Sequence, residues 1–470
     1  MLRNEFQIID QIYDSQVENK FIIKKLTVNE RIILLQKLEE SILAHRQEIT
    51  QGLHLDFRKS IIEAESTEIF PIISEIRLFR KNLKKWAKTK SVSNNIVFFG
   101  SNAKIQYEAK GNCLIISPWN YPFQLALVHL VACIAAGNTA IVKPSEFSPN
   151  TNKVVKKIIN SVFSSNHVEV VKGEIDVTTH LLNKKFDHIH FTGSPKVGKI
   201  IMAAGAKHLS SVTLELGGKS PLIIDDTMPL ETIVSKAIWG KLVNNGQTCI
   251  APDYILIQEN RLNDFVKSAI KYLEKTFGQD PKESPDLARI INNKNFHRIR
   301  DLIQDSIAKG AKCPYGNDYD EKELYIKPTL LTHVDSNSEI LHEEIFGPVF
   351  PIISYTTINE AINFINEREK PLALYIFSKN KALIQQISDE TSSGAVMVNE
   401  TLIHIMHPNL PFGGVNNSGI GSSTGKFGFE DFSHAKPVLD VNQLVSPTKF
   451  INYPYNSRTQ KIINLMMKYL

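Results

Sequence analysis

The sequence has few cysteines and no long apolar run. Its 470 residues include four cysteines, which lack C-x-x-C spacing and histidines at zinc-binding distances, so neither a disulfide framework nor a metal site is predicted. No run approaches the roughly 20 apolar residues that span a bilayer. Residues 1–14 mix Arg, Glu and Asp among apolar positions and lack the apolar core of a signal peptide. We therefore expect a cytoplasmic protein without bound metal.

Dense blocks of one charge are also missing. Lys and Arg total 54 and Asp and Glu 49, a net charge of +5, and no basic cluster stands beside interleaved aromatic residues. This pattern argues against nucleic-acid binding. Internal repeats and low-complexity segments are not found either. The hydrophobic content of 42% is typical of a globular protein, and the length exceeds one ordinary core, so two or three domains are expected.

What the sequence does contain is an alternation of apolar strands and helices. Apolar residues at helical spacing predict a long amphipathic helix over 28–57 and a second helix over 72–86. From residue 112, short continuous apolar runs predict parallel strands buried on both faces. This alternation predicts an open, doubly wound sheet that binds ligands outside the carboxyl ends of its strands. Its predicted elements are strands at 113–116, 139–142, 168–171 and 188–191 and helices at 123–136, 150–162, 175–183 and from Pro195.

A second α/β unit follows the first. Its predicted helices cover about 230–244, 260–276 and 293–309, and its predicted strands cover 254–257, 349–354, 373–377 and 394–398. The loop 341–348 lies between them.

Two segments stand outside the alternation. Short strands predicted at 96–99 and 104–107 flank Gly100-Ser101-Asn102 and form a hairpin that projects and meets another subunit. Residues 458–470 predict a helix with Ile462, Ile463 and Met466 on one face. At about 20 Å this helix is too short to cross a bilayer. We favour packing on its own subunit or a neighbour over a weak peripheral membrane contact.

Cys249 has the surroundings of a reactive thiol. Cys113 falls in a predicted strand and Cys133 in a predicted helix, where cysteine is usually a small buried apolar residue. Cys249 instead follows the polar turn 244–248, where the sulfur can attack an electrophilic carbon as the thiolate. Taken alone, this is a modest indication.

Glu215 lies in an apolar, strand-like context and is followed by Leu216 and Gly217-Gly218. A buried glutamate is unfavourable unless its carboxyl has a partner or a chemical role. Burial raises the pKa towards neutrality, where the carboxylate can take a proton from water. A structural salt bridge explains Glu215 equally well. The segment from Glu215 to Cys249 is long enough for a strand, a helix and a return, so the two residues can meet in space.

Polar residues follow the predicted strands of the first sheet. The amide of Asn120 can donate to a developing oxyanion, an interaction worth roughly 3–4 kcal/mol, although asparagine is also common in turns beside proline. Lys143 and Glu146 are candidates to hold ribose hydroxyls, and Gly193-Ser194 begins a helix that can face a pyrophosphate. The spacing of Gly193 and Gly198 differs from G-x-G-x-x-G and is a weak fingerprint.

Six motifs together resemble the NAD(P)-dependent aldehyde dehydrogenase superfamily. They occur in the family's order across nearly the whole chain, and the set is very specific although each motif is modest alone. They are Pro118-Trp119-Asn120, 143–146, 191–194, 215–221, 246–249 and 344–348. Four further segments are similar to the class 3, fatty-aldehyde-type branch: 239–241, 251–254, His404 and 410–415.

The resemblance implies oxidation of an aldehyde to a carboxylic acid with NAD⁺ or NADP⁺. Cys249 would form a thiohemiacetal and then a thioester, Glu215 would activate the hydrolytic water, and Asn120 with the Cys249 N–H would hold the oxyanion. Glu146 should repel a 2′-phosphate, which favours NAD⁺. Class 3 relatives imply medium- or long-chain aliphatic or aromatic substrates. The implied cofactor contacts are Trp119, Lys143, Glu146, Gly193, Ser194, Gly198, Leu216, Gly217, Glu344 and Phe346.

The resemblance also implies an α/β fold with two doubly wound parallel-sheet domains and a small β-flap. The flap would mediate a homodimer. The implied parts are a cofactor-binding domain over 1–89 and 111–217, a catalytic domain over 218–425, a flap over 90–110 and 426–450, and a tail over 451–470.

Two positions depart from the family's pattern. Pro195 follows Gly193-Ser194 where a small or hydroxylated residue is common, and proline suits the first turn of a helix. Asn416 replaces a glycine, and asparagine tolerates the left-handed region.

Two other functions stay open. A CoA-acylating relative would not need the hydrolytic base Glu215, and an inactive binding member of the fold would have lost the nucleophile or the base.

Overall fold

A six-stranded sheet organises the first half of the chain, in the order β17-β7-β6-β3-β4-β5. The five strands β3 to β7 are parallel, and β17 is antiparallel to β7. The chain winds outwards from β3 through β4 and β5 in one direction and through β6 and β7 in the other, as predicted for a doubly wound sheet. The strands are β3 Asn112–Ile116, β4 Thr139–Lys143, β5 Val168–Val170, β6 His188–Thr192, β7 Ser211–Glu215 and β17 Gly419–Ile420.

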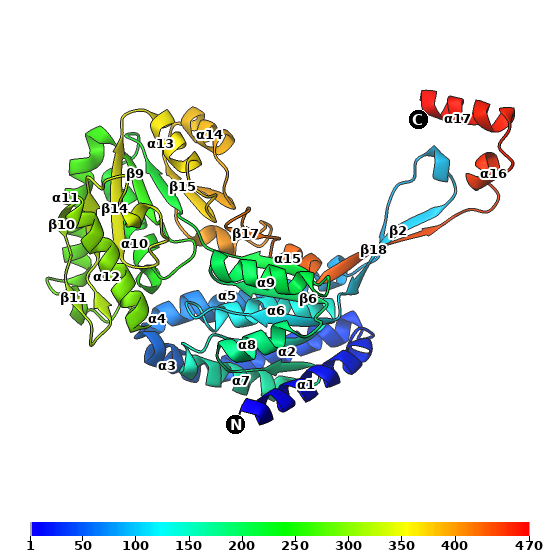
Figure 1. Cartoon of the computed structure of the whole chain (residues 1–470), viewed down its shortest axis with the longest axis horizontal. Helices are drawn as coiled ribbons and strands as arrows, with labels where there is room; N and C mark the ends of the chain where they lie inside the picture. The colour runs from blue at the N-terminus through cyan, green and yellow to red at the C-terminus, as the bar shows by residue number, and fades with distance from the viewer. Residues whose placement is uncertain (1, 470) are drawn as a thin grey trace.

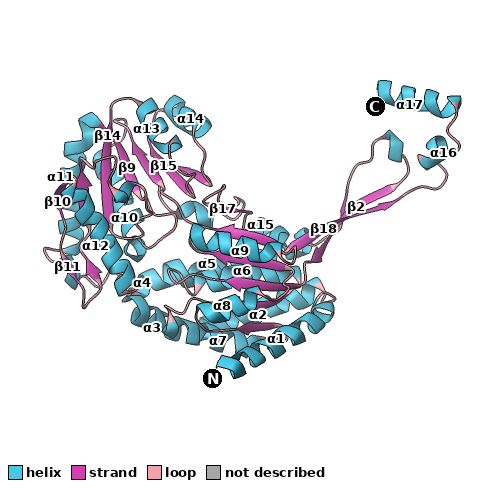
Figure 2. Ribbon diagram, in the orientation of Figure 1, coloured by secondary structure: helices cyan, strands magenta, loops and turns pink. Residues whose placement is uncertain are grey.

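Helices cover both faces of this sheet (Figure 1, Figure 2). One face packs on α2, α3, α5, α6 and α7, and the other on α1, α8 and α9. The helices are α1 Leu2–Ile23, α2 Val28–Ala44, α3 Arg46–Phe57, α4 Ile61–Ala64, the π-helix η1 Glu65–Ile69, α5 Phe70–Trp86, α6 Gln124–Ala136, α7 Pro149–Val162, α8 Ile175–Leu182 and α9 Pro195–Ala206. The computed structural model describes residues 2–469. Met1 and Leu470, the ends of the predicted ranges 1–89 and 451–470, lie outside the described residues.

The single helix predicted over 28–57 is wrong. His45 adopts φ −102° and ψ 14°, outside the helical region, and separates α2 from α3. Its ring Nδ1 lies 2.8 Å from the Ser41 carbonyl oxygen, so the side chain competes locally with the backbone ladder. Apolar periodicity continues across this break because both helices pack on the same core, which is why the sequence pattern did not reveal it.

A second, seven-stranded sheet has the order β10-β13-β14-β9-β8-β15-β16, with all strands parallel except β10. Its strands are β8 Pro221–Ile224, β9 Tyr254–Gln258, β10 Lys312–Tyr315, β13 Thr329–Thr332, β14 Val349–Tyr355, β15 Ala373–Phe377 and β16 Ala395–Val398. The helices around it are α10 Leu230–Leu242, α11 Leu262–Phe277, α12 Asn293–Ala308, α13 Ile358–Asn366 and α14 Lys381–Glu390. Short elements complete the unit: β11 Tyr319–Asp320, β12 Tyr325–Ile326, η3 Val243–Gly246, η4 Glu259–Arg261, η5 Pro281–Glu283, η6 Glu339–Leu341 and η7 Ile403–Met406.

The chain returns to the first sheet after the second one is complete. β17 pairs with β7, and helix α15, Gly425–Asp431, packs on α5 and α6. Both elements depart from the implied division of the chain. Residues 419–420, within the range 218–425, extend the first sheet, and residues 426–431, within the flap range 426–450, form a helix on its covering layer.

An antiparallel arm projects from the first unit (Figure 1). Its strands are β1 Lys90–Ser91, β2 Asn102–Ala109 and β18 Ser433–Asp440, in the order β1-β2-β18. The strand predicted at 96–99 is wrong. Ile96–Phe98 is a short 3₁₀ helix, η2, which begins where the Asn95 side chain accepts the Val97 N–H at 3.1 Å.

Beyond β18 the chain forms α16, Thr448–Ile451, and α17, Ser457–Tyr469. These helices and the 96–99 turn enclose an apolar groove whose lining includes Phe99, Phe450 and Ile462. The tail lies against the arm of its own chain, with Ile462 and Met466 half-exposed, and its packing on this subunit or on a neighbour stays a prediction. Within residues 2–469, no helix is both long and apolar enough to cross a membrane.

Candidate active site

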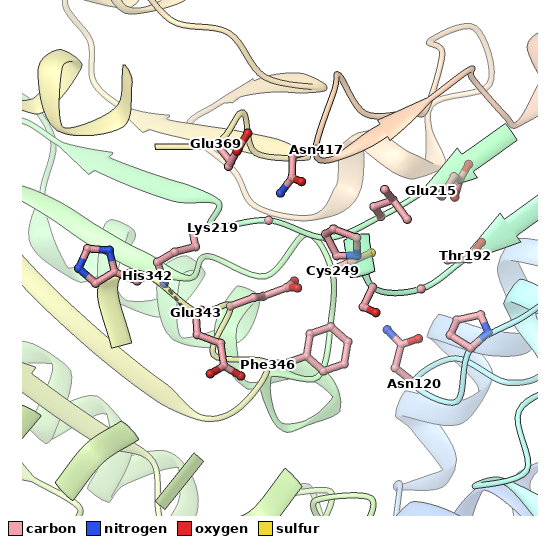
Figure 3. A pocket seen from close by; sticks show the side chains of 18 of the residues that line it. Asn120, Thr192, Glu215, Lys219, Cys249, His342, Glu343, Phe346, Glu369 and Asn417 are labelled. Carbon is pink, nitrogen blue, oxygen red and sulfur yellow. Dashed lines mark hydrogen bonds between the residues drawn. The ribbon is translucent and has the colours of Figure 1, made fainter. Parts of the chain in front are cut away.

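A cleft of about 670 Å³ lies between the two sheets, at the carboxyl ends of their parallel strands. Asn120, Glu215 and Cys249, the three residues predicted to do chemistry, all line it. Figure 3 shows Asn120 and Phe346 approaching the cleft from the two different units. The lining also includes seven of the residues predicted to contact the cofactor: Trp119, Gly193, Ser194, Leu216, Gly217, Glu344 and Phe346.

The loop that carries Cys249 has an unusual backbone. Asn244 and Asn245 are consecutive buried residues in the left-handed region, with φ 51° and 53°. Gly246 follows with φ 77°, and a Cβ there would overlap the Gly347 carbonyl oxygen. Backbone strain of this kind persists only where neighbouring groups hold it in place. Contacts with neighbouring residues therefore hold the loop in this conformation, which its own backbone would not favour.

Hydrogen bonds join the Cys249 loop to the turn after β3. The Asn120 Nδ2 donates to the Gln247 carbonyl at 3.1 Å, and the Asn244 Nδ2 donates to the Asn120 carbonyl at 2.7 Å. The hydroxyls of Tyr121 and Thr248 lie 2.7 Å apart. These bonds cross from the first unit to the second, so the oxyanion donor and the nucleophile are held in one frame.

Three charged residues at the α3–α5 junction hold both loops, and we call them the loop clamp: Lys59 and Glu68, which are buried, and Glu63, which is partly buried. The Lys59 Nζ lies 2.7 Å from the Glu68 Oε1, with both side chains fully buried. The Glu68 Oε2 accepts the N–H groups of residues 123 and 124 at 3.1 and 3.0 Å, which fixes the start of α6. The Glu63 Oε1 accepts the Asn244 N–H at 2.9 Å. The clamp was not predicted from the sequence. The charged residues within this helical stretch could have indicated it.

Glu215 ends β7 with its carboxyl turned into the interior, where 2% of the residue is exposed. Burial raises the pKa of this carboxyl. The Ser423 hydroxyl donates to Oε1, and the His129 Nε2 lies 4.0 Å from Oε2. Burial lowers the pKa of His129 well below its usual value, so the imidazole is neutral. His129 is therefore not a salt-bridge partner for Glu215, and neither His129 nor Ser423 was among the predicted residues.

The surroundings of Cys249 favour the thiol over the thiolate. Burial raises its pKa, and the carboxylates of Glu344 and Glu215 raise it further. The side chain packs against the apolar core of the second unit, as Ile405 does. One side of the sulfur thus faces the polar cleft and the other faces apolar side chains.

The 340–346 loop brings Glu344 and Phe346 to the cleft. Burial and then Asp253 raise the pKa of Glu344 to about 8. Its carboxylate lies against Gly217, where any Cβ would overlap it. The Phe346 ring meets the Trp119 ring edge-on, with the centroids 5.3 Å apart. Arg298 donates to the carbonyls of residues 344 and 345 at 3.0 and 2.8 Å and anchors this loop from α12.

The start of α9 fits an anionic group. Ser194 caps the helix by accepting the Val197 N–H at 3.4 Å, and Pro195 is the first helical residue, as its sequence predicts. Residues 192–195 line the cleft, so the positive end of the helix dipole faces it. A pyrophosphate would find backbone donors at this helix terminus. Asn416 has φ 54°, so asparagine does occupy the left-handed region here.

Three of the predicted cofactor residues lie outside the lining of the cleft. Lys143 ends β4, where its buried Nζ donates to the Pro144 carbonyl at 2.9 Å. Glu146 follows in the partly exposed turn after it. Gly198 lies inside α9, and a Cβ there would come within 2.8 Å of Leu216 Cδ2. Gly198 thus permits close packing of α9 on β7, a structural role that its spacing did not reveal.

A strand-end cleft between two doubly wound sheets, lined by a cysteine, a buried glutamate and a free helix terminus, matches a known class of enzyme. A model of the aldehyde dehydrogenase family matches residues 7–438. The chain belongs to this family, so it is an NAD(P)-dependent aldehyde dehydrogenase. The predicted family and α/β fold are confirmed.

Its relatives place it in the class 3-like branch. It is 44% identical over 405 residues to the 4,4′-diaponeurosporen-aldehyde dehydrogenase of Staphylococcus aureus, covering 86% of this chain and 88% of the relative. It is 44% identical over 430 residues to the mouse aldehyde dehydrogenase family 3 member A2, covering 92% and 88%. A substrate-bound structure of Staphylococcus aureus AldH superposes with a TM-score of 0.93 at 40% identity, covering 97% of this chain and 99% of that one.

Proposed function

We propose that this enzyme oxidises a hydrophobic aldehyde to the carboxylic acid through a thioester on Cys249. The supporting observation is that Asn120, Glu215 and Cys249, which lie far apart in the sequence, line one cleft. Hydrogen bonds between their loops fix Asn120 relative to Cys249. A nucleophile, an oxyanion donor and a buried base are the three groups that acyl transfer to water requires.

The proposed steps follow from these positions. The Cys249 thiol gives its proton to water in the cleft as the sulfur adds to the aldehyde carbon. The oxyanion of the resulting thiohemiacetal accepts the Asn120 Nδ2–H and the Cys249 N–H. NAD⁺ or NADP⁺, when bound, accepts the hydride that leaves this carbon. Glu215 then takes a proton from water, whose oxygen attacks the thioester carbon. The carbon–sulfur bond breaks, the carboxylic acid departs, and the Cys249 sulfur takes up a proton from water.

The cofactor would lie along the first sheet. Gly193 and Ser194 at the start of α9 would face its pyrophosphate, and Glu344 the nicotinamide ribose. Phe346 and Trp119 would flank the nicotinamide. Glu146, at the carboxyl end of β4 with Lys143, would face the adenosine ribose and disfavour a 2′-phosphate, so NAD⁺ is proposed as the preferred cofactor.

We propose a hydrophobic substrate, either a medium- or long-chain aliphatic aldehyde or an aromatic one. The support comes from the apolar side chains around Cys249, on the side that faces away from the cofactor residues. There the sulfur packs with Ile405 on an apolar core. The neighbouring segment also exposes Ile403, Met406 and Leu410. The Staphylococcus aureus relative is named for a diaponeurosporen aldehyde. Apolar side chains on this path would bind an alkyl or aryl chain by removing it from water.

Product analysis tests this function. The purified enzyme is mixed with aldehydes of two to sixteen carbons and with benzaldehyde, each with NAD⁺ or NADP⁺. We expect one acid per reduced cofactor, with kcat/KM rising with chain length. Cys249→Ala should abolish turnover, and full activity in this variant would overturn the mechanism. Formation of acyl-CoA in place of acid when CoA is added would identify the CoA-acylating alternative.

The assembly and location of the protein are further proposals. The arm of β1, β2 and β18 would join two copies into a homodimer, as its exposed apolar tip supports. All four cysteines are free, which supports a reducing, cytoplasmic compartment. Cell fractionation with an antibody to the chain tests the location.

A further inference from the structure

A row of polar residues crosses the buried interior of the first sheet. In β6 and β7 the cross-strand partners are His188 with Ser211, His190 with Thr213 and Thr192 with Glu215. The residues between them in sequence are apolar and pack on the opposite face. A parallel sheet covered on both sides is normally apolar throughout. These six residues, which we call the polar stripe, run from Glu215 at the cleft to Ser211 at the opposite edge.

Two further titratable residues cover the polar stripe from the helical layer. The His129 ring of α6 lies against the His190 ring, tilted by 32° with the centroids 3.7 Å apart. The Asp431 carboxylate of α15 reaches the middle of the stripe, where Oδ1 accepts the Thr213 hydroxyl at 2.6 Å. Its Oδ2 lies 3.3 Å from the His188 Nε2 and 3.8 Å from the His190 Nδ1. Asp431 therefore joins both histidines of β6.

The titratable groups form a continuous series from the cleft to the surface. A ring nitrogen of His190 and one of His129 each lie within 4.8 Å of a Glu215 carboxylate oxygen. His190 leads to Asp431, and Asp431 leads to His188. The His188 Nδ1 lies 3.2 Å from the Lys110 Nζ, which also lies 3.9 Å from the Asp431 Oδ1. Lys110 is partly exposed, so the series ends at solvent.

His190 is the least satisfied member of this series. It is completely buried, and neither ring nitrogen makes a hydrogen bond to any described residue. An unpaired buried polar group is unfavourable, and a phenylalanine would fill the same space without that cost. The position of His190 between two carboxylates therefore points to a chemical role.

The proposed reaction requires a route by which Glu215 can lose a proton, and this series of residues offers one. In every turnover Glu215 takes a proton from the hydrolytic water, and the carboxyl must lose that proton before the next turnover. Glu215 is almost fully buried, and the cofactor and product would fill the cleft at that moment. The following inference rests on this proposed function.

We propose that the series of titratable residues from Glu215 to Lys110, on and beside the polar stripe, carries the Glu215 proton to solvent. His190 is its central carrier. The O–H bond of protonated Glu215 breaks as a ring nitrogen of His190 takes the proton. The other ring nitrogen then releases a proton to Asp431, which passes it to the His188 Nε2. The His188 Nδ1 releases a proton to the Lys110 amine, which has first given one of its own to water. An imidazole can accept at one nitrogen and donate from the other, so no charge accumulates on the ring.

The charges around His190 favour this direction. Burial lowers the pKa of both His129 and His188, so both are neutral at rest. Burial also raises the pKa of Asp431, but its interactions with His188 and His190 outweigh this effect and keep it ionised. The remaining ionisable groups on this face are Cys113 and Cys133, both buried, and Lys110. The negative charge of Asp431 thus stabilises a proton on the neighbouring histidines once it has left Glu215, and Asp431 itself holds a proton only in passing.

A bound metal is the alternative use of these residues. His129, His190 and Glu215 form one possible ligand set, and His188, His190 and Asp431 form another. The lone pairs of an imidazole lie in its ring plane. The His129 and His190 rings are tilted by 32° with centroids 3.7 Å apart, so the two rings are poorly placed to share one ion. A metal there would also occupy the Glu215 carboxylate that hydrolysis requires.

Rapid-quench kinetics of His190→Gln test the proposal. His167→Gln is the matched control, because His167 is a buried histidine of the same unit that lies off the stripe. In His190→Gln we expect the first equivalent of acid per site to form at the wild-type rate and later equivalents about tenfold more slowly. The solvent deuterium isotope effect on the later turnovers should rise. His167→Gln should resemble the wild type in both phases.

Chemical rescue separates proton transfer from packing. In His190→Ala, added imidazole should restore the later turnovers, whereas pyrrole, which has the same shape but no basic nitrogen, should not. Equal slowing of the first and later turnovers, rescue by both compounds, or one zinc per chain in the purified enzyme would overturn the relay. A wild-type enzyme that forms no acid from any aldehyde would instead overturn the proposed function on which the relay rests.

Discussion

At the residue scale, burial decides what Glu215 and Cys249 can do. Burial raises the pKa of both side chains, which keeps the sulfur protonated and makes the carboxylate a stronger base. The reactivity of each group therefore depends on its surroundings and not on the side chain alone. In the proposed mechanism, burial in the cleft would make Glu215 a base, and the Cys249 thiol would have to lose its proton as substrate and cofactor bind.

Glu215→Gln should separate the two halves of the proposed reaction. Glutamine preserves the size of the side chain and its contact with Ser423 but cannot take a proton from water. Hydride transfer precedes hydrolysis, so we expect a burst of about one reduced cofactor per site, followed by turnover at least 10²-fold slower. Stopped-flow absorbance measures the burst, and intact mass spectrometry detects the accumulated acyl-enzyme. Steady-state turnover equal to that of the wild type would exclude Glu215 as the base.

Sequence motifs located the chemical residues but not the groups that hold them. Cys249 and Glu215 were predictable because each lies in a motif with unusual polarity for its context. Ser423 and His129 were not, since each reaches Glu215 from a different element. Gly198 was assigned to the cofactor by spacing alone, whereas its absent side chain makes room for Leu216. A contact between distant elements leaves no local signal in the sequence.

At the element scale, the short helix α4 and the π-helix η1 act on the site from outside it. Most long helices were predictable, because their apolar spacing continues for ten residues or more. An apolar run of four residues is a weaker signal, since it also occurs in buried loops: β16 was predicted, whereas β8 and β13 of the same length were missed. The loop clamp was missed because its three charges act on loops far away in sequence.

Removal of the Glu63 carboxyl should impair the nucleophile loop. In Glu63→Ala the buried N–H of Asn244 would lose its acceptor in a strained, left-handed segment. We expect a loss of about 1–3 kcal/mol in the free energy of unfolding and a roughly tenfold slower burst. Urea denaturation and stopped-flow kinetics measure the two effects. Glu63→Gln is the control, because an amide oxygen still accepts this bond, and an equal loss in both variants would contradict the role of the bond.

Glu75 on α5 should make stability depend on pH. Its Oε1 accepts the Gly425 N–H at 2.6 Å at the start of α15, and burial raises its pKa from 4.5 to about 7. A carboxyl with a raised folded-state pKa stabilises the fold fully below pH 4.5, and this contribution is lost as the pH rises through 7. The difference corresponds to about 3 kcal/mol at most.

Glu75→Gln should therefore stabilise the protein at high pH. Glutamine keeps the acceptor for Gly425 and removes the buried charge. We expect the free energy of unfolding to exceed that of the wild type at pH 8.5 and to match it near pH 4.5, as measured by urea denaturation at each pH. The exposed Glu18→Gln should show no such difference. A constant offset of Glu75→Gln at both pH values would contradict titration of this carboxyl.

At the scale of the whole molecule, the two sheets were predictable and their connections were not. The order of β3 to β7 follows from strand–helix alternation and the right-handed crossover rule. The return of β17 to the first sheet involves two residues, too few to give a pattern. The same return brings Ser423 and α15 close to Glu215. Ser423 could not be predicted as a partner of Glu215 because the return of the chain to the first sheet was itself not predicted.

The arm should hold two copies of the chain together. Its tip exposes large apolar side chains, among them Phe99 at 71% and Leu444 at 84%, and its groove has Phe450 on its wall. Monomeric proteins rarely expose a continuous apolar patch of this kind. A symmetric dimer would cover it on both copies at once.

The double variant Phe99→Asp/Phe450→Asp should therefore be a monomer. Two carboxylates at the tip would have to be buried in the dimer, which is strongly unfavourable without partners. Sedimentation velocity measures the mass, and we expect a wild-type dimer and a variant near the 53.0 kDa of one chain. Asn120, Glu215 and Cys249 belong to the same chain, so the burst of reduced cofactor should persist in the monomer. Ile175→Asp, which places the same charge on an exposed apolar position of α8 away from the arm, should remain a dimer. A double variant with the wild-type mass would show that the arm does not form the interface.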